Sequence, residues 1–179
     1  MKSVIFSAAG DYYATRRLKN HIGKLLVAGF PGMVTWIVLH FVKLNCTVKI
    51  EEVFSSFVNI QISAIAILIS FSIAIITIMV SADNDNIKKI KAMPSTECKK
   101  LKRTGETMSL FQVLLSNITY NVFVEVVYLI LLIFCIFLQM FIGESIIKII
   151  MAICVFFVVH IFHVLLESVG QMYLTFWKN

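Results

Sequence analysis

Four apolar runs occupy most of this 179-residue chain, and each is long enough to cross a lipid bilayer. A hydrocarbon core of roughly 30 Å needs about 20 helical residues at about 1.5 Å each. Backbone groups in hydrocarbon must be hydrogen-bonded within the protein, and continuous apolar runs exclude the alternating pattern of a β-barrel. We therefore predict an all-α polytopic membrane protein with four transmembrane helices, over Ile22 to Val42, Phe57 to Ser81, Thr119 to Ile142 and Ile146 to Gly170.

The composition leaves no room for a separate soluble domain. Hydrophobic residues make up 59% of the chain, and the mean hydropathy is +0.90, more than one soluble core of this size can bury. The other residues are divided among short connectors and tails. We expect an N-terminal segment 1–21, a four-helix bundle 22–170 that includes a connector 82–118, and a tail 171–179.

Basic residues are concentrated in the N-terminal segment and in the connector between the second and third spans. Because lysine and arginine are retained on the cytoplasmic side, we predict that both termini and this connector are cytoplasmic. The bias towards Ile, Lys, Asn and Phe favours a bacterial source, and hence the inner membrane. The basic residues of the connector are Lys88, Lys89, Lys91, Lys99, Lys100, Lys102 and Arg103.

The formal net charge of +6 is compatible with two anionic partners, the lipid headgroups and nucleic acid. Anionic lipid headgroups attract each nearby basic residue by about 1 kcal/mol, so we expect contact with the bilayer surface and no direct binding to nucleic acid. The connector is also the largest cytosolic surface and the candidate docking site for a cytosolic protein. We expect the second helix to continue through Ile87 to Ala92, until Pro94 stops it.

A stripe of small residues runs along the second span at helical spacings of three and four. Small residues let two helix backbones approach closely, which is the usual basis of helix association in lipid. We predict a packing surface, either within one chain or between protomers, while a pore lining is the alternative. The stripe consists of Ser63, Ala66, Ser70 and Ala74.

Four ionisable residues lie within the last two spans: Glu125, His160, His163 and Glu167. Such groups are rare in membranes and are expected to face the bundle interior and to pair. Glu125 and His163 both lie about 9 Å inside the inner boundary, so a contact between them is expected. The cluster has three interpretations: a polar clamp that fixes helix register, a proton or ion pathway, or a metal site.

The sequence contains no motif of an enzyme. We find no phosphate-binding loop, Ser-His-Asp pattern, cysteine metal ladder or dinucleotide fingerprint. We therefore expect a non-enzymatic protein without a cofactor or a resident metal.

The layout and the segment LLSNITYNVFVEVVYLILL (Leu114 to Leu132) resemble the small four-span membrane proteins of bacterial prophage and defence loci. The greatest similarity in size and topology is to the membrane subunits of Kiwa anti-phage systems. The resemblance implies a homo-oligomer, a tetramer, that recruits a cytosolic DNA-binding effector during phage infection. The two functions to be weighed are such a scaffold and sensor, and a homo-oligomeric ion-conducting pore or holin-like effector.

Overall fold

The computed structural model describes residues 12–13, 18–41, 49–81, 85–95 and 108–177, and nearly all of these residues lie in helices. Four of the helices are long and apolar enough to cross a membrane, which confirms an all-α, multi-pass membrane protein. The elements are α2 (Leu18–Phe41), α3 (Ile50–Ser81), α4 (Asp85–Ala92), α5 (Leu110–Leu138) and α6 (Glu144–Trp177).

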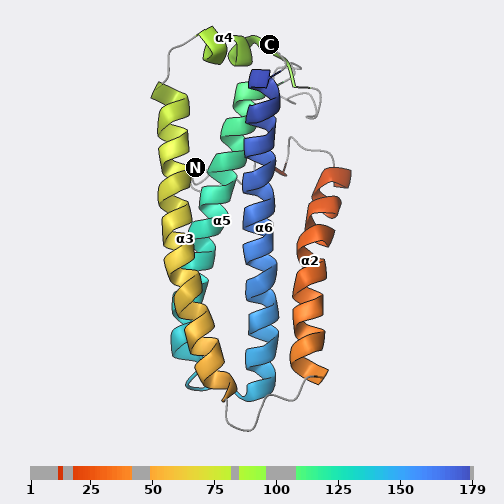
Figure 1. The fold of residues 1–179 in the computed structure, drawn as a ribbon, viewed down its shortest axis with the longest axis vertical. Coiled ribbons are helices and arrows are strands. Elements are labelled where there is room, and N and C mark those ends of the chain that lie inside the picture. Colours follow the sequence, from red (N-terminus) through yellow and green to blue (C-terminus); the bar gives the residue numbers. More distant parts are fainter. Residues whose placement is uncertain (1–11, 14–17, 42–48, 82–84, 96–107, 178–179) are drawn as a thin grey trace, which may run out of the picture.

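Helices α3, α5 and α6 pack together along their length, and α2 packs chiefly against α6 (Figure 1). The buried core joins Phe54 of α3, Tyr128 and Leu132 of α5, and Ile147 and Ile161 of α6. Most of the outward-facing side chains in the bundle are large and apolar, as expected for surfaces in contact with lipid. The outer face of α2 is especially exposed, because this helix has neighbours on one side only.

All four membrane helices begin earlier than the apolar runs predict, and the difference is largest for α3 and α5. Helix α3 starts at Ile50 rather than Phe57, and Glu51 and Glu52 occupy its first turn, where acidic side chains favour the helix dipole. Helix α5 starts at Leu110 rather than Thr119, because Ser109 and Gln112 form a reciprocal capping box. A hydropathy pattern detects only the apolar part of a helix, so it misses a first turn that contains polar residues.

Helix α4 is a separate element that lies across one end of the bundle, so the expected continuation of the second helix through Ile87 to Ala92 is wrong (Figure 1). Its residues Ile87 and Ile90 are buried. Ile90 packs in a cluster with residues of α3 and α5 that include Met79 and Leu114. Two backbone hydrogen bonds fasten the following residues to the start of α5, from Ser95 N to Met108 O and from Leu110 N to Met93 O, both 2.8 Å.

Candidate functional site

Polar side chains gather in the half of the bundle nearest α4. Glu125, on α5, is fully buried. Its Oε1 atom accepts hydrogen bonds from Ser72 Oγ of α3 (3.2 Å) and from Asn121 Nδ2 one helical turn away (2.8 Å). Its Oε2 atom and Asn121 Oδ1 have no hydrogen-bond partner among the described residues. Glu125 therefore fastens α3 to α5, and its hydrogen bonds do not go to His163.

Lys24 and Glu167 form an ion pair between α2 and α6. Lys24 is buried, and its ammonium group also donates a hydrogen bond to the Tyr12 hydroxyl (3.1 Å). The Tyr12 ring lies flat against the Tyr120 ring of α5, with centroids 3.9 Å apart and planes parallel within 1°. These contacts hold Tyr12 of the N-terminal segment against α2 and α5, and Lys24 connects it to Glu167 of α6.

A chain of hydrogen bonds begins at the neighbouring Tyr13. The Tyr13 hydroxyl lies 2.8 Å from the Tyr120 hydroxyl, which lies 3.1 Å from Nε2 of His160 on α6. Tyr13 is exposed, whereas His160 is only 7% exposed. The Nδ1 atom of His160 has no hydrogen-bond partner among the described residues. The chain therefore leads from an exposed phenol to an unsatisfied ring nitrogen in the protein interior.

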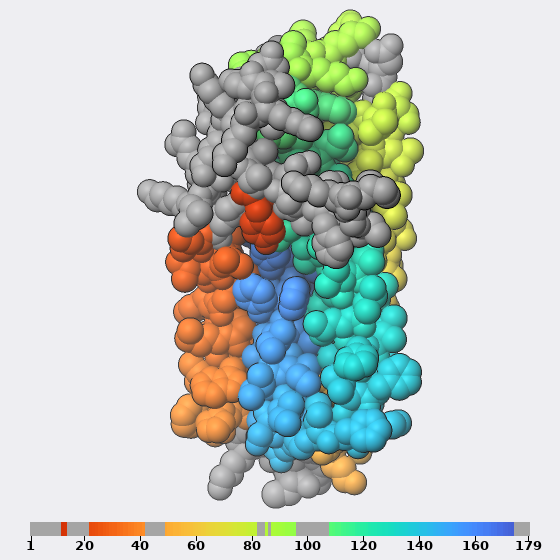
Figure 2. Space-filling view, turned by 180° about the vertical axis from the view of Figure 1, so that it is seen from behind, coloured from red at the N-terminus to blue at the C-terminus, as the bar shows by residue number. Residues whose placement is uncertain are grey.

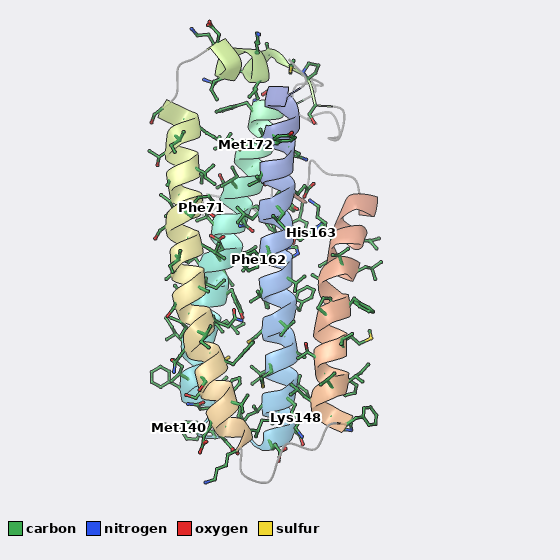
Figure 3. All side chains as sticks on the ribbon, viewed as in Figure 1. Phe71, Met140, Lys148, Phe162, His163 and Met172 are labelled. Atoms are coloured by element: carbon green, nitrogen blue, oxygen red, sulfur yellow. The ribbon has the colours of Figure 1, made fainter. Side chains whose placement is uncertain are left out.

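The four ionisable residues expected to form one cluster are divided among different partners. Glu125 bonds to Ser72 and Asn121, His160 to Tyr120, and Glu167 to Lys24. His163 lies partly exposed in the half of α6 nearest α4 (Figure 3). Over the parts of the chain that the structure describes, no three histidine, cysteine or acidic side chains come together as a group that fits a metal ion.

The most informative partners were not singled out by the sequence. The sequence pattern singles out neither Lys24 nor the tyrosines Tyr12, Tyr13 and Tyr120 as partners of the ionisable residues. One signal was available: Lys24 and Glu167 have opposite charge and lie at the same side of their respective spans, which favours a pair. The stacking of Tyr12 on Tyr120 joins residues more than a hundred positions apart and has no local pattern.

The three lysines of helix α4 are exposed, and one of them also contacts α5. Lys88 and Lys89 are exposed, and the Lys91 ammonium lies 5.1 Å from the centre of the Phe111 ring. This cation–π contact steadies α4 on the start of α5. The other predicted partner-binding residues lie outside the described residues: Lys99, Lys100, Lys102 and Arg103.

The stripe of small residues on α3 faces away from the bundle. Its members Ser63, Ala66, Ser70 and Ala74 are all exposed, and α3 packs inside the chain through the opposite side, which includes Phe54, Val58 and Ile65. The hydroxyls of Ser63 and Ser70 donate to backbone carbonyls one turn earlier, on Asn59 and Ala66. Asn59 and Thr77 lie on the same exposed face and extend the predicted stripe at its two ends.

Comparison with protein-family models, with curated proteins and with solved structures finds no significant match to this chain.

Proposed function

We propose that this chain is a non-enzymatic scaffold and sensor of the bacterial inner membrane, a homo-oligomer that recruits a soluble effector to its cytosolic end. The observation that carries this proposal is the seating of α4. This amphipathic helix lies across the end of the bundle, with Ile87 and Ile90 buried and Lys88 and Lys89 exposed. A helix fixed in this way is a preformed, basic surface at the end of a membrane protein.

Such a surface favours an acidic partner. Exposed charges of one sign steer a partner of the opposite sign and suppress partners of the same sign, even where each pair adds little affinity. The basic residues of the following segment belong to the same connector and extend its charge. The side of the membrane on which α4 lies is inferred from the distribution of basic residues in the sequence.

The α3 stripe supports self-association. Side chains that face lipid are expected to be large and apolar, as Ile60, Ile67 and Ile78 of the same helix are. The small and hydroxyl-bearing stripe beside them is better suited to the close approach of a second copy of this chain. A tetramer, a DNA-binding effector and an anti-phage setting are suggested by the resemblance in size and topology alone.

The experiment is co-purification of the membrane protein with any soluble protein that a neighbouring gene encodes. We expect the wild type to retain that protein and the double variant Lys88→Glu, Lys89→Glu to lose most of it. Lys49→Glu is the control, because this exposed lysine precedes α3 at the opposite end of the bundle. Equal retention by the double variant and the control would contradict recruitment through α4.

An ion-conducting oligomer is the second candidate, and the exposed hydroxyls of the α3 stripe are the observation that favours it. The same face, turned towards the axis of a ring of copies, would line a pore. Ion flux from liposomes that contain the purified protein tests this function. Flux that Ser70→Leu abolishes and Ile67→Leu leaves intact would support a pore, and an absence of flux from the wild type would contradict it.

A further inference from the structure

Two cavities lie beside α6, the first chiefly between α5 and α6 and the second between α2 and α6. The first, named here the histidine cavity, has a volume of about 250 Å³ and is lined by Tyr13, Tyr120, Val127 and His160, among others. The second, named the glycine cavity, has a volume of about 330 Å³, and its lining includes Gly29, Gly32 and Trp36. Phe156 lines both cavities, so they are neighbours along α6. Figure 2 shows this face, with α6 visible between α2 and α5.

The glycines of α2 create the second cavity. A Cβ atom added at Gly29 would meet nothing within 4 Å, so the absent side chain leaves open space. A Cβ atom at Gly32 would lie 3.0 Å from the Ala152 carbonyl oxygen, so this glycine allows α2 to approach α6 closely. Close helix contact at Gly32 and open space at Gly29 together form an open, apolar groove that faces lipid.

His160, which lines the histidine cavity, has one buried ring nitrogen, Nδ1, without a hydrogen-bond partner among the described residues. A phenol is a good donor to an imidazole nitrogen, so we assign the Tyr120 hydroxyl as the donor to His160 Nε2. In this tautomer Nδ1 carries the proton and is a donor without a partner among the described residues. A buried donor favours a ligand that brings an acceptor, because an unmade hydrogen bond in an apolar place is costly.

The remaining wall of the histidine cavity is aromatic and compact. Tyr13, Tyr120, Phe123, Phe156 and Phe157 line it, and the rings of Phe156 and His160 are parallel within 7°. Flat rings pack well against such faces. Small-ligand sites usually measure about 300–1,000 Å³, so the two cavities together suit a single molecule with a small head and an apolar tail.

We propose that the two cavities bind one membrane-dissolved molecule that has a flat, carbonyl-bearing ring as its head and an aliphatic tail, which is the chemistry of a membrane quinone. The ring carbonyl accepts the hydrogen bond from His160 Nδ1, and the tail lies in the glycine cavity over Gly29. A phospholipid also offers a carbonyl, in its ester, but it has no flat head for the aromatic wall.

A molecule bound in the histidine cavity would contact Tyr13 of the N-terminal segment. Tyr13 lines the histidine cavity, and the adjacent Tyr12 is held by Tyr120 and by Lys24 with its partner Glu167. A ligand in the cavity therefore contacts the segment that precedes α2.

Native mass spectrometry of the delipidated full-length chain tests the site, with decylubiquinone as one probe and dioleoylphosphatidylglycerol as the other. We expect one decylubiquinone per chain, and an affinity lowered about tenfold by Gly29→Leu or Val127→Trp, which fill the two cavities. Gly23→Leu is the control for the first variant, because its Cβ also meets nothing within 4 Å and Gly23 lines neither cavity. Val126→Trp is the control for the second, because Val126 is 39% exposed, close to the 41% of Val127, and lines neither cavity.

His160→Phe keeps a ring in place and removes the donor, and we expect it to weaken decylubiquinone binding about fivefold. Displacement of decylubiquinone by equal concentrations of the phospholipid would overturn the proposal and assign the cavities to lipid chains. Equal binding by the filled variants and their controls would overturn it as well. Size-exclusion profiles of all five variants show that the bundle is intact.

Discussion

Tyr12 lies face to face with Tyr120, with ring centroids 3.9 Å apart, and so fixes the N-terminal segment to the middle of the membrane bundle. The Tyr12 ring is buried, and its hydroxyl accepts a hydrogen bond from Lys24. The stacking accounts for the position of residues that the sequence alone places only near the membrane surface. A variant that removes the Tyr12 ring therefore tests the contact between this segment and the bundle.

Replacing Tyr12 with alanine is expected to lower the free energy of unfolding by about 3 kcal/mol, because a buried aromatic ring is lost. Tyr12→Phe keeps the ring and loses only the hydrogen bond, so it is expected to cost about 1 kcal/mol. Thermal unfolding in detergent, followed by circular dichroism, measures both. Equal melting temperatures for the wild type and Tyr12→Ala would show that Tyr12 does not pack against the bundle.

The Lys24–Glu167 pair is expected to behave as a coupled unit. Lys24→Met leaves a carboxylate without its cation in a mostly apolar place and is expected to cost about 3 kcal/mol. The double variant Lys24→Met, Glu167→Met removes both charges, and we expect it to recover most of that loss. Unfolding free energies of the two single variants and the double variant form the cycle that checks this. Strictly additive effects would count against a direct ion pair.

Glu125→Gln is expected to leave stability unchanged or slightly raised. The amide oxygen can still accept from Ser72 and Asn121, and the amide nitrogen supplies a donor for Asn121 Oδ1, which has no partner among the described residues. Glu125→Ala removes the hydrogen bond from Ser72 of α3 and the bond from Asn121 within α5, and is expected to cost about 2 kcal/mol. Melting temperatures of the purified variants decide this, and a Glu125→Gln variant as unstable as Glu125→Ala would refute the assignment.

The exposed stripe on α3 predicts a change in assembly without a change in fold. Ala66→Leu is expected to prevent the close approach of a second copy and to lower the oligomeric mass in detergent. Ile67→Leu is the matched control, since Ile67 is an exposed neighbour outside the stripe. Light scattering coupled to size-exclusion chromatography gives the mass. An unchanged mass for Ala66→Leu, in a wild type larger than one chain, would place the interface elsewhere.

The apolar runs were sufficient to predict four membrane helices, because twenty apolar residues in succession have few other stable locations. They misplaced the starts of α3 and α5, where Glu51 and the capping pair Ser109 and Gln112 extend the helices with polar residues. They also merged α4 with α3, because an amphipathic helix that folds back across the bundle end looks locally like a continuation of the span.

The candidate site was predictable only in part. Glu125, His160 and Glu167 stand out because ionisable groups are rare in lipid, and this rule requires only the residue and its depth. Their partners Ser72, Tyr120 and Lys24 are set by the rotation and pairing of helices distant in sequence. A single sequence contains no local pattern for those contacts, so the expected pairing of Glu125 with His163 was not the arrangement found.

The proposed function requires that α4 presents a basic surface to the cytosol at one end of the four-helix membrane bundle. Labelling with a membrane-impermeant maleimide tests it most directly, with Lys89→Cys introduced after the four native cysteines are replaced by serine. We predict that intact cells leave residue 89 unlabelled and that labelling appears only when the membrane is opened. Strong labelling of intact cells would place α4 outside and contradict the account.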